Sequence, residues 1–218
     1  MTHPLLAGLD SNVAMRLAAA STYLDVLLGN MVFREGDQPG GIYLVLKGQI
    51  KILLQTGHGR EKVIDLIAAG GSFGEPALLL DRPQPANAEA ASDAELLYLG
   101  RTAVLHEIRE NPQFAKRMIG SLAGRMYGYV ENMKSHLLLT GTQRVVCFLL
   151  NSLPDDEARQ DVAITFPAKK GVIASGLNLT QEHFSRILHD LSAASLIEVT
   201  GPRVRIRDVG RLRALQPA

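Results

Sequence analysis

The sequence predicts an α+β chain with an N-terminal antiparallel β-domain, one long helix, and a C-terminal domain of short helices and a hairpin. Three patterns predict this order. Short alternating apolar runs broken by glycines extend from about Gly29 to Leu99. Apolar residues then recur every three or four positions from Phe114 to Leu137, and shorter helical segments follow. We expect these parts to span residues 1–110, 111–139 and 140–218.

The composition is that of an ordinary soluble protein with a substantial core. The chain has 218 residues, of which 46% are hydrophobic and 21% charged, enough for one large or two small domains. No stretch approaches the roughly 20 apolar residues that cross a bilayer, and no leader pattern follows Met1, so we expect a cytoplasmic protein without a membrane partner. The single cysteine, Cys147, excludes an intramolecular disulfide and a metal site made of several cysteines.

Glycine turns punctuate the predicted β-domain. The apolar run Met31–Phe33 precedes a turn at Gly36, and Ile42–Leu46 precedes a turn at Gly48. A further run, Ile50–Leu54, leads to Gly57-His58-Gly59. Helices would need longer uninterrupted periods, so this spacing predicts a compact roll or barrel.

The segment after Asn111-Pro112 predicts one long helix, since proline is acceptable in a first helical turn. Its apolar stripe is wide enough to pack on its own β-domain and on the same helix of a second copy. We therefore predict a homodimer, and the alternative is a helix buried within one chain. The predicted dimer interface consists of Phe114, Met118, Leu122, Met126, Tyr129, Met133 and Leu137, beside a second row of Ala115, Ile119, Ala123 and Val130.

Residues 167–191 have helix-turn-helix spacing. A short helix is expected from about Ala168 to Ser175, then a turn over Gly176–Leu179, then a second helix with Thr180 as its N-cap. The second helix has two faces: Phe184, Ile187, Leu188 and Leu191 on one, and Glu182, Ser185, Arg186 and His189 on the other. The polar face is free to enter a groove of DNA.

The chemistry of that polar face suits base reading. An arginine fork matches the guanine acceptors, a carboxylate accepts from the cytosine amino group, and a hydroxyl adapts to either role. We therefore expect Glu182, Ser185 and Arg186 to read bases. The predicted hairpin around residues 201–202 carries outward arginines that can touch phosphates. The expected backbone contacts are Thr180, Lys169, His189, Arg203 and Arg205.

Charge supports this assignment only weakly. From Val162 onward the chain has eight Lys or Arg residues against four Asp or Glu residues, a net charge of +4. A basic segment fits a nucleic-acid face, but a solvated amphipathic surface helix with scattered arginines is the alternative.

Two motifs resemble the family of the cyclic-AMP receptor protein and the fumarate and nitrate reduction regulator, and the resemblance covers nearly the whole chain. Gly70–Glu75 resembles the opening of that family's phosphate cassette, and Glu182–Arg186 resembles the Glu-x-x-Ser-Arg recognition signature of its nitrate-respiration branch. The resemblance implies a cyclic-nucleotide-binding-like β-roll, a dimerisation helix and a winged helix-turn-helix. It further implies a transcription regulator that binds palindromic DNA with TTGAT-like rather than TGTGA half-sites. If the regulator activates transcription, the resemblance also implies that it contacts RNA polymerase.

The cassette departs from the cyclic-AMP pattern. Where cyclic-AMP binders place Arg and then Ser or Thr, this chain has Gln84 and Pro85. Gln lacks the charged fork that a cyclic phosphate needs, and Pro offers neither a hydroxyl nor an N–H. Tyr129 and Val130 also stand where that branch has small hydroxyl residues, so cyclic AMP is disfavoured. The expected effector pocket comprises Phe73, Gly74, Glu75, Gln84, Pro85, Met126, Tyr129 and Met133.

Other effectors follow from the same resemblance. The segment Asp81–Pro85 is similar to the cassettes of cluster-free regulators of denitrification and nitrosative stress, which implies haem and nitric oxide. The candidate haem ligands are His3, His58, His106 and His136. A single cysteine excludes an iron–sulfur cluster held by cysteines of one chain. The alternatives are a cyclic-nucleotide-responsive or a ligand-independent regulator of the same fold.

An enzyme is the competing class. A small β-barrel enzyme of cupin type needs clustered histidines and a carboxylate for its metal. The sequence has no His-x-His pair, P-loop or His-Glu-x-x-His motif, so we expect no enzymatic activity and assign no catalytic residue.

Overall fold

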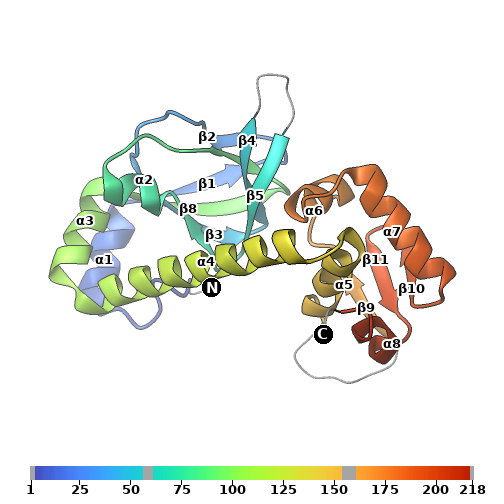
Figure 1. The fold of residues 1–218 in the computed structure, drawn as a ribbon. Coiled ribbons are helices and arrows are strands. Elements are labelled where there is room, and N and C mark those ends of the chain that lie inside the picture. The colour runs from blue at the N-terminus through green and yellow to red at the C-terminus, as the bar shows by residue number, and fades with distance from the viewer. Residues whose placement is uncertain (1–2, 56–60, 154–160, 217–218) are drawn as a thin grey trace. The chain divides into compact units, whose positions relative to one another are not determined.

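The computed structural model describes residues 3–55, 61–153 and 161–216. The chain forms two compact units, Met1–Tyr127 and Gly128–Ala218 (Figure 1). None of the helices in these residues is long and apolar enough to cross a membrane. The predicted turn at Gly57-His58-Gly59 lies outside the described residues.

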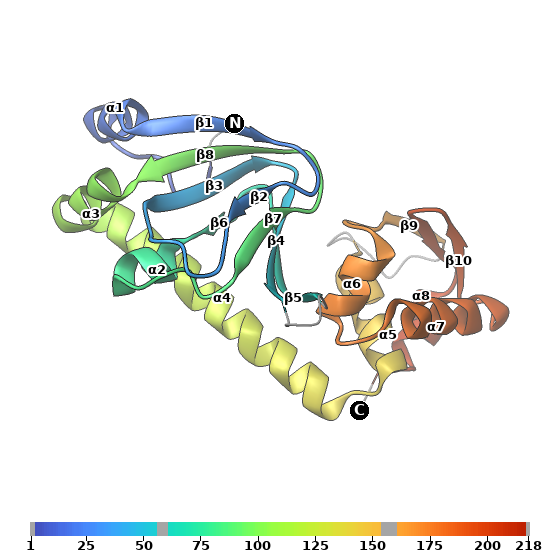
Figure 2. The same ribbon diagram turned by 90° about the horizontal axis from the view of Figure 1, so that it is seen from above.

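The first unit contains a β-roll of two four-stranded antiparallel sheets, which confirms the predicted class. One sheet has the order β1 (Ser21–Val26), β8 (Ala94–Gly100), β3 (Gly41–Lys47) and β6 (Ser72–Phe73). The other has the order β2 (Met31–Phe33), β7 (Asn87–Ala90), β4 (Gln49–Gln55) and β5 (Glu61–Ala68). Figure 2 shows β1, β8 and β3 running side by side.

The turn between β3 and β4 requires glycine, as its sequence indicates. Gly48 has φ +77°, in the left-handed region, and a Cβ there would lie 2.1 Å from the carbonyl oxygen of Asp93. An L side chain would therefore meet both backbone strain and a steric clash.

Helices cover one end of the roll. The helices α1 (Ser11–Ala19) and α3 (Arg101–Glu110) lie side by side (Figure 1), and α2 (Glu75–Leu80) follows β6. The long helix α4 (Pro112–Leu138) has 27 residues and begins directly after Asn111, as the sequence predicts, while the bounds 111–139 of a separate part stay a prediction. Asn111 caps it, because its side-chain Oδ1 accepts from the backbone N–H groups of Gln113 and Phe114, both at 3.1 Å.

The first unit has two apolar cores. One lies between the sheets and includes Val45, Ile50, Phe73 and Leu96. The other joins the helices to the roll. Phe114 and Met118 of α4 are buried in this second core, and Leu122 packs against it.

The burial of α4 corrects the predicted dimer interface. Phe114 and Met118 face the core of their own unit, so their side chains have no surface left for a second copy. Six of the exposed apolar residues of α4 instead follow a line with alternating steps of four and three, whereas Tyr127, Tyr129 and Leu138 are exposed beside it. We call this line the outer seam: Ile119, Ala123, Met126, Val130, Met133 and Leu137.

The second unit combines helices with a three-stranded sheet. Its helices are the end of α4, α5 (Gly141–Asn151), α6 (Lys170–Gly176), α7 (Gln181–Ala193) and α8 (Val209–Arg213). The sheet has the order β10 (Ile197–Thr200), β11 (Arg203–Ile206) and β9 (Val162–Thr165). The predicted hairpin is confirmed, but it carries a third strand, β9, which the sequence reading missed.

Candidate nucleic-acid interface and effector region

The pair α6 and α7 forms the predicted helix-turn-helix. The first helix begins at Lys170 and ends at Gly176, so it lies about one to two residues later than expected. Asn178 in the turn has φ 56°, a left-handed conformation that Asn tolerates, and the backbone N–H of Leu179 donates to the carbonyl of Ala174 at 2.9 Å. Thr180 is the N-cap of α7 as predicted, because its hydroxyl accepts from the N–H of His183 at 3.2 Å.

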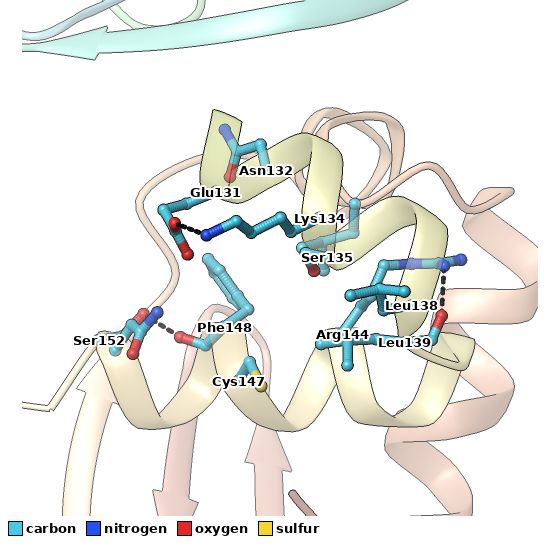
Figure 3. Close-up of a pocket in the computed structure, with 12 residues that line it drawn as sticks. Glu131, Asn132, Lys134, Ser135, Leu138, Leu139, Arg144, Cys147, Phe148 and Ser152 are labelled. Atoms are coloured by element: carbon cyan, nitrogen blue, oxygen red, sulfur yellow. Dashed lines mark hydrogen bonds and ion pairs between the residues drawn. The ribbon is translucent and has the colours of Figure 1, made fainter. Parts of the chain in front are cut away.

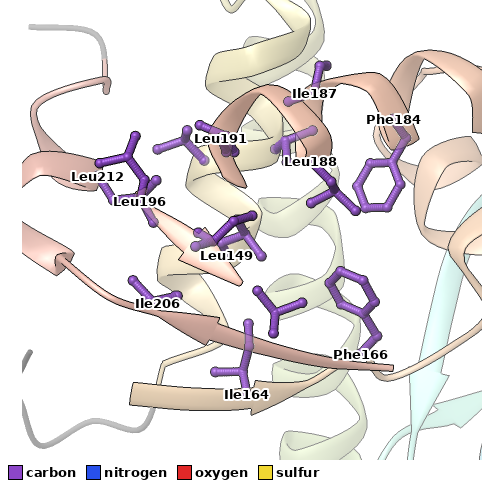
Figure 4. Close-up of a cluster of buried hydrophobic side chains, with 14 of the residues drawn as sticks. Leu149, Ile164, Phe166, Phe184, Ile187, Leu188, Leu191, Leu196, Ile206 and Leu212 are labelled. Atoms are coloured by element: carbon purple, nitrogen blue, oxygen red, sulfur yellow. The ribbon is translucent and has the colours of Figure 1, made fainter. Parts of the chain in front are cut away.

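One face of α7 anchors it to the unit's core. Phe184, Ile187, Leu188 and Leu191 are all buried, as their spacing predicts, and belong to the same core cluster as Leu149 (Figure 4). The rings of Phe184 and Phe166 lie with their centroids 6.0 Å apart, a tilted aromatic contact. This packing fixes the rotation of α7 about its own axis.

The opposite face of α7 is open. The exposed residues of this face are Glu182, Ser185, Arg186 and His189. Because the opposite face is fixed in the core, these four side chains point to solvent together. Hydrogen bonds from its own backbone N–H and from the Thr180 hydroxyl lower the pKa of Glu182, which keeps this carboxylate ionised. The face therefore offers an acceptor, a hydroxyl and a guanidinium in neighbouring positions.

The small sheet carries cations on its outer side. Arg203, Arg205 and Arg207 are exposed while the residues between them are buried, as the predicted alternation requires. Arg205 pairs with Asp161 at 3.2 Å and Arg207 pairs with Glu198 at 2.7 Å. Arg203 carries no such ion pair within the part of the chain that the structure describes. Lys169, the N-cap residue of α6, is also exposed.

Glu75 of the cassette is held by protein groups. It is completely buried and accepts a hydrogen bond from the Ser72 hydroxyl. Arg125 of α4 donates to the Glu75 carboxylate at 2.7 Å and to the Ser72 carbonyl at 2.7 Å. The sequence reading missed Arg125, because nothing in the local spacing links residues 50 positions apart.

The other predicted pocket residues of the roll differ in exposure. Gly74 has φ +93°, and a Cβ there would lie 3.1 Å from the Gly41 carbonyl oxygen, so the cassette needs glycine. Phe73 is buried and stacks on Tyr43 with centroids 5.0 Å apart, so its ring belongs to the core and the prediction that it lines a pocket is wrong. Gln84 is buried and Pro85 is exposed.

The remaining predicted pocket residues lie on α4. Met126, Tyr129 and Met133 are exposed there, and their contact with an effector stays a prediction.

Ser72 is the serine of a Gly-x-Ser-x-Gly spacing, Gly70–Gly74, which hydrolase nucleophile elbows also have. The Ser72 hydroxyl is buried and donates to the Glu75 carboxylate, so it is not an exposed nucleophile beside a base.

The histidines fit haem ligation unequally. His3 is buried, its Nε2 lies 2.9 Å from the Gly71 carbonyl and its Nδ1 accepts from the Leu5 N–H at 3.2 Å. Both ring nitrogens are thus engaged, and His3 does not fit an axial ligand. His136 Nε2 lies 3.2 Å from the Gly176 carbonyl, His106 is exposed, and His58 lies outside the described residues. Within the described ranges, no three His, Cys, Asp or Glu side chains are grouped to hold a metal.

Comparisons with known families match both units. The cyclic nucleotide-binding domain family matches residues 25–111, and the Crp-like helix-turn-helix domain family matches residues 143–215. The cyclic AMP receptor protein of Thermus thermophilus is 28% identical over 187 residues, covering 86% of this chain and 84% of that protein.

Solved structures agree on the fold. The structure of FixK2 from Bradyrhizobium japonicum superposes with a TM-score of 0.79 at 22% identity, covering 91% of this chain and 98% of that one. Lysophospholipase nte1 of Aspergillus terreus is 27% identical over 126 residues, which are 58% of this chain but only 8% of that enzyme. That match is confined to a small part of the enzyme. The chain therefore carries a domain of the cyclic nucleotide-binding family followed by a Crp-like helix-turn-helix domain, the domain content of a CRP-like DNA-binding transcription regulator.

Proposed function

We propose that the protein is a homodimeric, sequence-specific regulator that reads DNA with the exposed face of α7. The observation that carries this proposal is the division of α7 into a fully buried apolar face and an open polar face. A recognition helix must be held rigidly by one side while the other side enters the major groove. Thr180 supports the same geometry, because the N-terminus that it caps is the end of the helix that approaches base edges.

Three side chains of α7 are the proposed base readers. Arg186 supplies a bidentate fork for guanine, Glu182 accepts from the cytosine amino group, and Ser185 contributes a short hydroxyl. Glu182 is ionised because its pKa is lowered, so it acts as an acceptor only. The Glu-x-x-Ser-Arg order favours TTGAT-like half-sites.

The proposed phosphate contacts surround that helix. Arg203 is the strongest of them, since it is exposed and unpaired among the described residues, whereas Arg205 already binds Asp161. Lys169 at the start of α6, Thr180 and His189 complete the set. Phosphate contacts set the register of the protein without reading sequence.

The outer seam is the proposed dimer interface. Steps of four and three residues are the spacing of a two-stranded coiled coil. Its large members are about half or more exposed in the single chain, from 48% for Val130 to 77% for Leu137, and an apolar line of that length is normally covered. A twofold dimer then places two copies of α7 about one DNA turn apart, so the site is a palindrome with half-sites spaced by roughly 10 bp.

Selection from randomised duplex DNA tests this proposal. We expect enrichment of palindromes with TTGAT-like half-sites. Enrichment of TGTGA-type half-sites would overturn the branch assignment while leaving the regulator intact. Recovery of no preferred sequence would overturn base reading by α7.

The proposed effector is a small molecule other than cyclic AMP. Gln84 and Pro85 replace the phosphate-gripping pair, and the Glu75 carboxylate is already bound by Arg125. Haem with nitric oxide stays the candidate that the branch resemblance implies, with His106 and His136 as its candidate ligands. A Soret band after incubation with haem would support it, and its absence favours the ligand-independent alternative.

A further inference from the structure

A cavity of about 600 Å³ opens between the last turns of α4 and helix α5, wholly inside the second unit (Figure 3). Ser135 and Leu138 line it from α4, Cys147 and Phe148 line it from α5, and Leu177 completes the wall. This volume falls in the range of about 300–1,000 Å³ that is usual for small-molecule sites. The cavity is separate from the β-roll, which belongs to the first unit.

Arg144 brings an unsatisfied cation to this cavity. Its Nη1 donates to the Leu139 carbonyl at 2.8 Å. Its Nε is inaccessible to solvent and has no hydrogen-bond partner among the described residues. A ligand in the cavity cannot reach this shielded N–H, so it would meet the guanidinium at Nη2, for which the described residues supply no acceptor.

The charged side chains around the cavity do not neutralise Arg144, so its guanidinium can pair with an anion. Lys134 and Glu131, at its edge, pair with each other at 2.7 Å (Figure 3). Within the described part of the chain, Arg144 has no carboxylate partner. An anion is therefore the occupant that the charges favour, and the planar fork of arginine matches a carboxylate.

Dimerisation through the outer seam leaves this cavity open. Ser135 lies two residues from both Met133 and Leu137, and two residues on an α-helix are about 200° apart. The cavity and the outer seam thus occupy opposite faces of α4.

We propose that this cavity binds a small amphipathic carboxylic acid. The hydrocarbon part packs against Leu138, Phe148 and Leu177, and the carboxylate accepts from Arg144. The ligand joins the end of α4 to α5 and thereby fixes the base of the DNA-binding unit. That regulatory consequence rests on the proposed function, but binding itself does not.

Calorimetry with octanoate on the full chain, without DNA, tests the binding. We expect octanoate to bind and 1-octanol, its neutral analogue, to bind roughly ten- to a hundredfold more weakly, since a charged hydrogen bond is lost. Arg144→Gln should weaken octanoate binding by the same factor, and Ser135→Trp should abolish it by filling the cavity. Arg213→Gln, an exposed arginine of the same unit, is the matched control and should change nothing.

Cys147 gives an independent local readout. It is the chain's single cysteine and one of the residues that line the cavity, and its Sγ accepts from Gln216 Nε2 at 3.7 Å, so maleimide adds one mass increment at a known place at the edge of the cavity. We expect octanoate, but not octanol at the same concentration, to slow that reaction in the wild type and in Arg213→Gln. Thermal unfolding of each variant separates loss of the site from loss of the fold.

Equal binding of octanoate and octanol, or no protection of Cys147 at millimolar octanoate, would overturn the proposal. An effect of Arg213→Gln as large as that of Arg144→Gln would do the same. A change in DNA affinity is a separate measurement: if octanoate binds but DNA affinity stays constant, the site stands and its regulatory role fails.

Discussion

Charging the outer seam should convert the dimer to a monomer. We consider the double substitution Met126→Lys and Met133→Lys, whose side chains are 67% and 62% exposed in the single chain. Full burial of a methionine side chain contributes about 1.5–3 kcal/mol, so covering two-thirds of one contributes about 1–2 kcal/mol. Four such side chains in a dimer contribute about 4–8 kcal/mol, before any repulsion between lysines. The dimer dissociation constant should therefore rise by a factor of about 10³ or more.

Light scattering at micromolar concentration measures this directly, because a single chain has a mass of 23.6 kDa. We expect the wild type at twice that mass and the double variant at the single-chain mass. Asn132→Lys is the control: it adds a charge to the same turn, about 100–120° around the helix from Met133 and Met126, and should leave the dimer intact. A double variant that stays dimeric with unchanged affinity, or a monomeric wild type, would refute the assignment of the seam.

Three further outcomes follow from single sites. Cyclic AMP should show no micromolar binding by calorimetry, and a micromolar dissociation constant would mean that another cation, such as the exposed Arg82, grips the phosphate. Thr180→Ala removes the N-cap acceptor of α7 and should lower the free energy of unfolding of the second unit by about 1 kcal/mol in urea. Thr180→Ser keeps a hydroxyl at this position and should retain the wild-type stability. Burial lowers the pKa of His3 below 6.5, so the unfolded chain binds more protons there and stability should fall as the pH drops below that value. His3→Gln should flatten this decline, and an unchanged pH profile would contradict it.

Local chemistry explains which elements the sequence predicts well. Glycines at tight turns, the asparagine before α4 and the proline that begins it, and the N-cap threonine of α7 all act within a few residues, so their effects are visible in sequence. The periodic burial of Phe184 and Ile187 is equally local. The roll, the long helix and the helix-turn-helix were therefore predicted correctly.

Long-range pairing explains what was missed. Strand β9 is short and alternates only partly, and it becomes a strand because β11 offers it an edge. The contact of Arg125 with Glu75 joins α4 to the cassette and has no local signal. The exposed seam of α4 takes residues from both predicted rows, because spacing alone cannot tell where along the helix a row turns from the chain's own core to solvent.

The most direct test of base reading compares Arg186→Ala with Arg203→Ala on the preferred palindrome, on its single-base variants and on random DNA, across a salt series. We expect Arg186→Ala to lose about 1–3 kcal/mol of discrimination at one base pair while random-DNA affinity stays unchanged. Arg203→Ala should weaken all sequences alike and reduce the slope of log affinity against log salt by roughly one. Equal weakening of preferred and random DNA by both substitutions would contradict the placement of α7 in the major groove.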